Sequence, residues 1–406
     1  MVFSVAIAAF SRIPLLPDIG DDLSLTPGEI GLLTTAFGLG RLGMDLPAGR
    51  LSQAAPPYVA LAGAGFALAL SCALLAVSES LLEALGASTL MGCASALTNT
   101  TGMYAFATTG GAGHRGASMA LFTTALLSGQ MLGPALGGAL GSLLGWRSSL
   151  AIAASIGALV AVTCFAWRHR VRGIGDAEDS ANRGRDRHAA GNASRRAARV
   201  KSLSRGELLA LAATPFASFF ALAGLTQTLV PLIGAGELDL SASAIGLAIG
   251  VGAAIRFVAA WVAGIGSDRL SRKIVLVPSL GLMSLGAAVL AVPTGAAWAG
   301  AIALLAIGSA AISVAAAALA DRVPAERLGH ELGVFRLVGD LGLLVGPAAA
   351  AFLYQESGRA LAGGVSAAVF AAAALVAAVW TQEPTQLDVG GPREARGGEG
   401  AEGLPE

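Results

Sequence analysis

The sequence predicts an all-α integral membrane protein in which twelve transmembrane helices form two parallel-repeat six-helix bundles. The 406-residue chain is 55% hydrophobic and only 13% charged, with a mean hydropathy of +0.70, whereas a soluble domain is about 25% charged. Apolar runs of about 18–25 residues, the length of helix that crosses a bilayer, recur from end to end. The second half of the chain also repeats landmarks of the first at a nearly constant spacing.

Each expected span is an apolar run that ends at a charged, glycine-rich or proline-containing segment, where a helix turns or leaves the membrane. The twelve expected spans cover residues 1–17, 27–51, 56–77, 81–108, 116–141, 147–167, 206–233, 242–265, 273–292, 296–320, 329–354 and 360–381. The first run lacks the basic start and the small-residue cleavage site of a secretory signal, so we interpret it as a span.

Two polar segments divide the chain into its expected parts. Residues 1–167 form an N-terminal six-helix bundle, 168–205 a disordered basic linker, 206–381 a C-terminal six-helix bundle and 382–406 a disordered tail. Because cytoplasmic loops of membrane proteins are enriched in Lys and Arg, the arginine-rich linker is expected on the cytoplasmic side. Six spans on either side then place both termini there, in a multi-pass protein of the cell's plasma or inner membrane.

The internal repeat is the strongest sign of two similar halves. The segment that begins at Arg41 aligns without gaps with the segment that begins at Arg256. Matching positions in the two halves are Arg41 with Arg256, Gly49 with Gly264, Gly133 with Gly346 and Pro134 with Pro347. Since parallel repeats of membrane transporters enclose the substrate path between them, near the bilayer midplane, we expect any site at the interface of the halves.

The turn after the eighth span carries the most specific motif in the chain. Its residues are Gly264, Asp268, Arg269, Arg272 and Lys273. This spacing resembles the loop motif of the major facilitator superfamily, and the resemblance extends over nearly the whole chain. In that family the loop latches the two halves together on the cytoplasmic side, so the resemblance implies a gating loop here. The matching loop after span two is degraded, with Gln53 and Ala54 at the positions of the acid and the base. For Arg272 and Lys273 the alternative is an ordinary basic surface turn.

The fifth span contains a second family motif, of the form G-x-x-x-G-P-x-x-G-G. Its residues are Gly129, Gly133, Pro134, Gly137 and Gly138. The family associates this pattern with antiporters that export their substrates, so the resemblance favours export. The proline removes a helix hydrogen bond and kinks the span, and the glycines let another helix approach closely. The alternative is a packing motif without any bearing on direction; Gly346 and Pro347 are its remnant in span eleven.

Four charges inside the spans are candidates for gating or coupling, because charge in lipid is costly. Span two carries Arg41 and Asp45, and span eleven carries Arg336 and Asp340. Asp45 and Arg336 lie at matched depth, about 10 Å from the cytoplasmic end; Arg41 and Asp340 lie about one turn further in. The family resemblance implies that these two spans face each other, so we expect the cross-half pairs Asp45–Arg336 and Arg41–Asp340. The alternative is that each pair closes within its own helix at i and i+4.

Further polar residues at middle depth are candidates for substrate contact. Arg256 has no acid at the position that matches Asp45, so it either holds an anionic group of the substrate or bonds backbone carbonyls. Gln130 and Asn99 either contact substrate or make hydrogen bonds between helices. We expect Arg12, near the outer end of span one, to extend its guanidinium to the interface.

Together these features predict a secondary active transporter of a small organic molecule, with alternating access between the halves and proton-coupled efflux by antiport. The alternatives are an importer or uniporter of a metabolite on the same fold, or a non-transporting membrane sensor. The four histidines lie in or beside loops, and the sequence shows no metal-ligand spacing, so we expect neither an enzyme nor a metal or cofactor site. The expected partners are the lipid bilayer, the substrate and protons, without nucleic acid, and the chain is expected to be a monomer.

Overall fold

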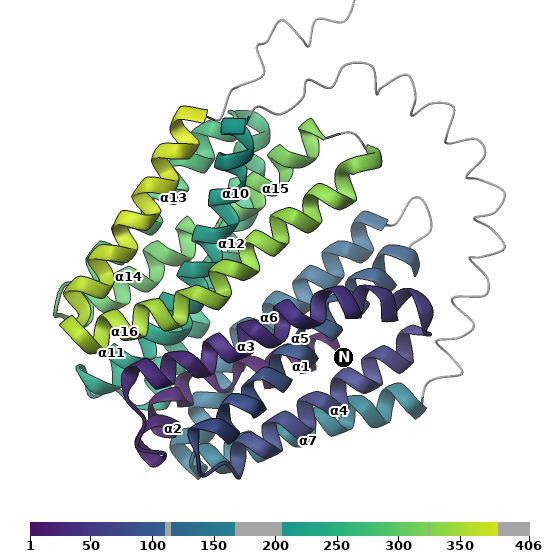
Figure 1. The fold of residues 1–406 in the computed structure, drawn as a ribbon, viewed down its shortest axis with the longest axis vertical. Helices are drawn as coiled ribbons and strands as arrows, with labels where there is room; N and C mark the ends of the chain where they lie inside the picture. Colours follow the sequence, from purple (N-terminus) through teal and green to yellow (C-terminus); the bar gives the residue numbers. More distant parts are fainter. Residues whose placement is uncertain (110–114, 167–204, 324, 381–406) are drawn as a thin grey trace, which may run out of the picture.

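A computed structural model describes all residues except 110–114, 167–204, 324 and 381–406, and its described residues form helices without a strand (Figure 1). The fold class expected from the sequence, twelve transmembrane helices in two six-helix bundles, is confirmed. The expected disordered linker and tail lie outside the described residues, apart from Arg205 at the start of α10.

The N-terminal half contains six spans. Its elements are α1 (Val2–Phe10), η1 (Ile13–Leu15), α2 (Leu16–Asp22), α3 (Pro27–Ala54), α4 (Pro57–Ala76), α5 (Leu81–Thr109), α6 (Arg115–Leu144) and α7 (Trp146–Ala166). The first three elements together form span one. That span is broken because Pro14 and Pro17 lack the N–H groups that a continuous helix needs.

The C-terminal half repeats this order. Its elements are α10 (Arg205–Phe220), the π-helix η3 (Ala221–Leu229), α11 (Val230–Gly236), α12 (Ala242–Arg269), α13 (Arg272–Leu290), α14 (Gly295–Gly308), α15 (Ala311–Arg322) and α16 (Ala325–Trp380). Span seven is α10–η3–α11, and span ten is α14–α15. The loop expected at 355–359 is shorter than predicted: α16 covers spans eleven and twelve, and the chain breaks helical geometry only at Gly358, with φ of 71°.

Nine described segments are long and apolar enough to cross a membrane, judged by length and composition. The last of them, Glu331–Trp380, contains the two spans on either side of Gly358. With α3 and α6, of 28 and 30 residues, they account for the twelve predicted spans. The hydropathy pattern therefore placed nearly every span boundary within a few residues.

Side-chain caps mark where several spans begin. Thr26 and Glu29 form a reciprocal capping box at the start of α3, with Pro27 as the first helical residue. The hydroxyls of Ser241 and Thr294 accept hydrogen bonds from the first turns of α12 and α14. These caps satisfy backbone N–H groups at the helix ends, where the chain turns between spans.

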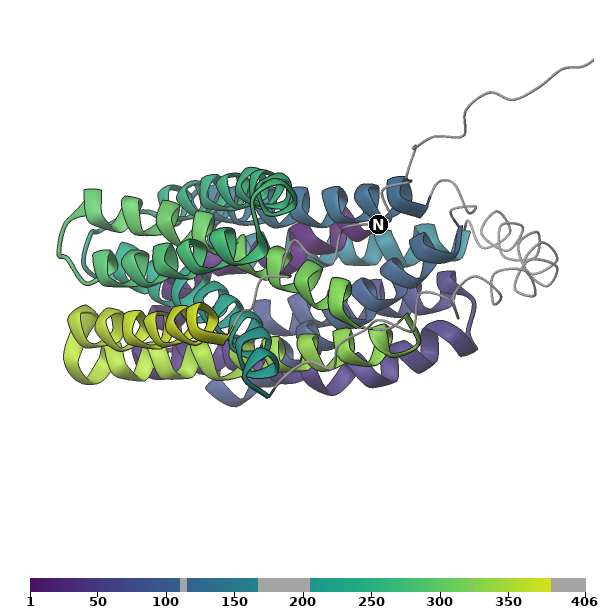
Figure 2. The same cartoon turned by 90° about the horizontal axis from the view of Figure 1, so that it is seen from above.

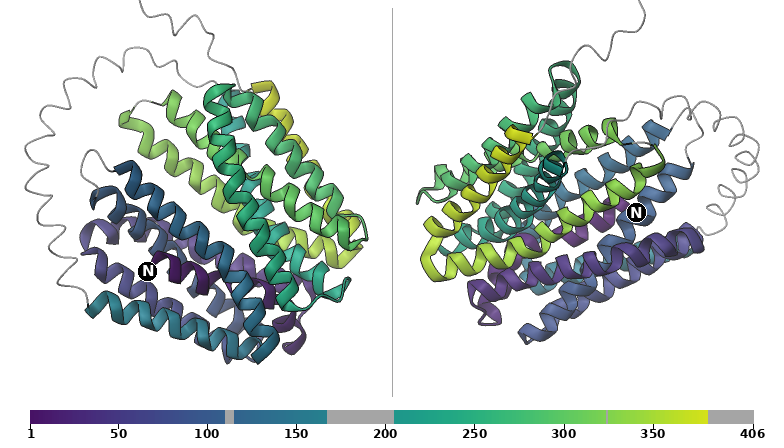
Figure 3. Two further views of the ribbon diagram at one scale, coloured as in Figure 1. Left: turned by 180° about the vertical axis from the view of Figure 1, so that it is seen from behind. Right: turned by 45° about the horizontal axis from the view of Figure 1, so that its top comes forward.

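The two halves lie side by side and pack most closely at one end (Figures 1 and 2). We call the end where α7 stops and α10 starts the linker end, and the opposite end, with the α2–α3 and α11–α12 turns, the distal end. The hydrophobic core of the N-terminal half continues at the distal end into Leu232, Ala242 and Ala351 of the other half. Toward the linker end the ribbons of the halves spread apart (Figure 3).

Candidate functional site

Four charged side chains meet at the interface between the halves, on α3 and α16. Arg336 Nη2 lies 3.2 Å from Asp45 Oδ1, and Arg41 Nη2 lies 3.6 Å from Asp340 Oδ1. These are the two cross-half pairs expected from the matched depths. The within-helix alternative is partly present as well, because Arg336 Nε lies 3.9 Å from Asp340 Oδ2. The four groups therefore form one cluster, which we call the charge cluster.

The two pairs of the charge cluster differ in their access to solvent. The Asp340 side chain is 1% exposed, and neither of its carboxylate oxygens has a hydrogen-bond partner among the described residues. Asp45 and Arg336 are 20% and 32% exposed. Because a buried carboxylate without hydrogen bonds is held in its charged form mainly by nearby cations, Asp340 depends on Arg41 and Arg336.

A cavity of about 680 Å³ adjoins the charge cluster. It is lined by Leu42, Asp45, Leu46, Thr100, Gly333, Val334, Arg336, Leu337 and Asp340. The cavity extends from the ion pairs along α3 and α16 toward the linker end. The two helices are therefore apart at the cavity, although Asp45 and Arg336 beside it are in contact. Whether the pairs break when this end opens further stays a prediction.

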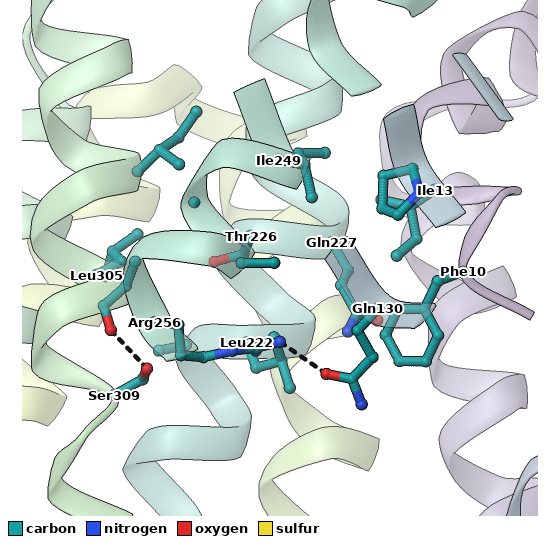
Figure 4. Close-up of a pocket in the computed structure, with 16 residues that line it drawn as sticks. Phe10, Ile13, Gln130, Leu222, Thr226, Gln227, Ile249, Arg256, Leu305 and Ser309 are labelled. Carbon is teal, nitrogen blue, oxygen red and sulfur yellow. Dashed lines mark hydrogen bonds between the residues drawn. The ribbon is translucent and has the colours of Figure 1, made fainter. Parts of the chain in front are cut away.

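A second, smaller cavity of about 30 Å³ lies between the halves at the level of the helix breaks (Figure 4). Arg256 of α12 points across it and donates a hydrogen bond from Nη2 to Gln130 Oε1 of α6, at 2.7 Å. Thr226, Gln227 and Ser309 add polar groups to its lining. We call this the central cavity. Arg256 therefore donates to a side chain of the opposite half. The sequence had left backbone carbonyls as an alternative partner, and that alternative is wrong.

Asn99 is not brought to this place. It is half-buried in α5, and neither of the two cavities has it in its lining. Its neighbour Thr100 lines the large cavity instead. Gln227, by contrast, lies in the central cavity because span seven is a π-helix at this point, where nine residues from Ala221 to Leu229 follow the wider turn. Hydrophobic periodicity in the sequence does not distinguish a π-helix from an α-helix.

The expected gating loop forms a tight turn at the linker end. Ser271 caps the start of α13, and Arg272 Nη1 donates a hydrogen bond to Ser267 Oγ, at 2.7 Å, in the last turn of α12. A side-chain carbon at Gly264 would meet no atom within 4 Å. The motif therefore forms the turn between α12 and α13, while the side chain of Asp268 lies outside the described atoms. Arg269 and Lys273 belong to the same turn, and the latching role of the loop stays a prediction.

The glycine motif of α6 is a packing surface in this structure. Gly129 and Gly133 face α1 and Gly137 faces Ser11 just after it; the nearest atoms of span one would lie 2.0–2.8 Å from a side-chain carbon at these glycines. Gly138 faces the opposite half, and a side-chain carbon there would lie 2.2 Å from the Ala242 carbonyl oxygen. The motif thus lets α6 contact span one and α12 at once, which agrees with both the exporter and the packing interpretation.

The sequence did not indicate the role of Thr35, whose side chain bridges an interrupted backbone hydrogen bond in α16 of the other half. Its hydroxyl donates to the Leu344 carbonyl at 3.1 Å and accepts from the Ala348 N–H at 3.2 Å. An uninterrupted α-helix would join those two backbone groups to each other. The hydroxyl is inserted beside Pro347, which has no N–H of its own, and a sequence pattern that describes one helix at a time cannot show this contact.

Arg12 corrects an expectation. Its side chain is 1% exposed and stacks over the Phe37 ring at 4.8 Å, so it does not extend to the membrane interface. Nε and Nη1 have no hydrogen-bond partner among the described residues. The helix break at the start of η1 turns this residue into the core of the N-terminal half.

Gly138→Ala is expected to lower the melting temperature by about 2–6 °C, because the new methyl group would force α6 and α12 apart at the distal end. The measurement is thermal unfolding of the purified protein in detergent. Gly43→Ala is the matched control, since a side-chain carbon there meets no atom within 4 Å. Equal melting temperatures of the two variants would contradict the close contact at Gly138.

Comparison with known proteins identifies the family and the fold. No curated protein sequence matches the chain, but the family model of the Major Facilitator Superfamily matches residues 1–291 and, in a second match, residues 216–401. Solved structures share the fold. The xylose transporter XylE from E. coli, in an inward open conformation, aligns with a TM-score of 0.71 at 13% identity, covering 95% of this chain and 96% of that one.

Two further structures are similar over comparable lengths. A bacterial homologue of the human lysosomal transporter Spinster, inward-facing and occupied, aligns with a TM-score of 0.68 at 15% identity, covering 93% of this chain and 91% of that one. A mutant of the peptide transporter POT aligns with a TM-score of 0.70 at 16% identity, covering 93% and 92%.

With the family model matched over most of the chain, the two six-helix halves are those of a multi-pass membrane transport protein rather than an enzyme. The chain belongs to the Major Facilitator Superfamily.

Proposed function

We propose that the chain exports a small organic molecule by proton antiport, with alternating access between two moving bodies, residues 1–167 and 206–381. The observation that carries this proposal is the charge cluster. Asp340 and Asp45 each form an ion pair across the interface of the halves, beside a cavity. Protonation of either carboxyl would remove the attraction of its pair, so proton binding and the separation of the halves are linked.

The protein is proposed to act as a monomer in the cell's plasma or inner membrane, with the linker end on the cytoplasmic side. The orientation is inferred from charge. It rests on the many arginines between residues 168 and 205. In this orientation the cavity of about 680 Å³ lies toward the cytoplasm. Two of the similar structures, XylE and the Spinster homologue, are described as inward open and inward-facing.

The proposal predicts uptake into everted membrane vesicles that rises with an acid-inside proton gradient and falls when a protonophore collapses it. The labelled probes are xylose, a dipeptide, a monocarboxylate, an amino acid and a cationic dye; the first two are chosen because XylE and POT carry such solutes. Vesicles with the double variant Arg41→Gln/Asp340→Asn should hold the protein but show weaker stimulation by the gradient, because Asp45 is then the only carboxyl left in the charge cluster.

Other outcomes decide between the alternatives. Uptake that persists after the gradient is collapsed would remove proton antiport. Gradient-driven uptake confined to right-side-out vesicles would identify an importer. Expressed, folded protein that moves none of the probes would favour the sensor.

A further inference from the structure

Arg256 is a cation at the interface of the halves that has no counter-charge among the described side chains. Its Nη2 bonds the neutral amide of Gln130, its Nε has no hydrogen-bond partner, and no described carboxylate lies within ion-pair distance of it. The other interfacial arginines, Arg41 and Arg336, each have an aspartate partner. An uncompensated charge at this depth is costly, so its presence calls for a partner that the chain itself does not supply.

The central cavity is built to receive such a partner. None of the sixteen residues that line it is acidic, and its polar side chains other than Arg256 are hydroxyls and amides, which can donate hydrogen bonds. Arg12, the other interior arginine without a described acid partner, lies in the core of the N-terminal half and lines neither cavity. Arg256 alone of these two combines an unpaired charge with open space.

A second observation points to the same place independently. The π-helix from Ala221 to Leu229 runs along this cavity and contributes Ala221, Leu222, Thr226 and Gln227 to its lining. A π-helix is less favourable than an α-helix, and short π segments inside α-helices are frequent at functional sites. Figure 4 shows Thr226 and Gln227 near the Arg256–Gln130 hydrogen bond, and all four residues line the cavity.

Charge and size narrow the class of ligand. One guanidinium neutralises one negative charge, so a monoanion leaves the site neutral, whereas a dianion would leave a buried excess charge. The volume of about 30 Å³ suits a group the size of about two water molecules, which a carboxylate matches. Phe10, Ile13 and Ile249 supply apolar surface for the remainder of the molecule, for which the cavity must widen.

We propose that the central cavity binds the carboxylate of a small monoanionic organic molecule through Arg256, and that this molecule is the transported substrate. Only the claim that the bound molecule is the transported substrate rests on the proposed transport function; the claim of carboxylate binding does not. Gln130 would be the residue of the opposite half that senses the bound anion, because it shares the guanidinium with the ligand.

The test is ligand-dependent thermal unfolding of the purified full chain in detergent, at constant ionic strength set with sodium chloride. The probes are formate, acetate and benzoate, each compared with its neutral amide. At least one carboxylate should raise the melting temperature by about 2 °C or more above the value with its amide. In Arg256→Gln and in Gln130→Glu this difference should vanish, with an apparent Kd at least about tenfold weaker.

Gln130→Glu keeps the test decisive if Arg256→Gln does not fold. It places a carboxylate of the protein at the atom that already accepts from Arg256, so the site is filled from within and the fold is kept. Arg147→Gln is the matched control, since this arginine lies far from the central cavity in a partly exposed pair with Asp22; it should keep the carboxylate response.

Two results would overturn the proposal: amides that stabilise the wild type as well as carboxylates do, or a carboxylate response that survives in both site variants. Gradient-driven transport of a neutral or cationic probe without any carboxylate response would sink this inference and leave proton antiport standing. Carboxylate binding together with transport that does not depend on the proton gradient would support this inference and contradict proton antiport.

Discussion

Replacing Arg41 with glutamine is expected to lower the free energy of unfolding by about 3 kcal/mol, one of the two largest effects we expect from a single change in this chain. Arg41 lies 3.6 Å from the Asp340 carboxylate, which is 1% exposed and has no hydrogen-bond partner among the described residues. Without Arg41, the carboxylate keeps only the longer contact to Arg336, at 3.9 Å. The measurement is denaturant unfolding of the purified protein in detergent micelles.

The double variant Arg41→Gln/Asp340→Asn separates loss of a pair from loss of packing. Two neutral amides of similar shape leave no buried charge behind, so most of the stability should return. Asp340→Asn alone should cost less than Arg41→Gln, because Arg41 also lies near Asp45 and keeps an acid in its surroundings. A double variant that is no more stable than Arg41→Gln would show that the two groups are not energetically coupled.

The sequence predicted most of the fold because lipid imposes a simple rule on it. Every span must be long and apolar, so hydropathy locates the spans, and turns at charged segments locate their ends. The rule does not describe the interior of a span. The break at Arg12 and the π-helix after Phe220 depend on prolines, cavities and neighbouring helices, and they were not predicted, whereas the turn at Gly358 was predicted as a longer loop.

Some contacts of the candidate site were likewise predicted from the sequence, and others were not. The pairs of Arg41 with Asp340 and Asp45 with Arg336 followed from counting depth along two helices that the family resemblance places face to face. The bond of Arg256 to Gln130 did not follow, because it depends on the rotation of α6 and α12 about their axes. The Thr35 hydroxyl of α3 bonds the Leu344 carbonyl and the Ala348 N–H of α16. The residue pattern of either helix alone does not indicate this contact.

Reversing one charge of the outer pair, in Asp45→Arg or in Arg336→Asp, is expected to open the linker end, and reversing both should close it again. Asp45 and Arg336 bridge the halves at 3.2 Å beside the large cavity, so like charges there would push α3 and α16 apart. Because Arg336 also approaches Asp340, the reversals belong in the Arg41→Gln/Asp340→Asn background, where the reversed residue meets no second acid. Contacting residues couple by about 0.5–3 kcal/mol, which shifts a two-state population by a factor between about 2 and about 150.

Spin labels attached at Gly49→Cys and Gly333→Cys can report this opening without a known substrate. Both glycines lie in the linker-side parts of α3 and α16, and a side-chain carbon at either meets no atom within 4 Å. The three native cysteines would be replaced by serine. Each single reversal should move the label–label distances to longer values, and the double reversal should restore the distribution of the background. If the double reversal stays as open as the worse single one, the outer pair does not hold the halves together, and Arg336 then acts within α16, through its contact with Asp340.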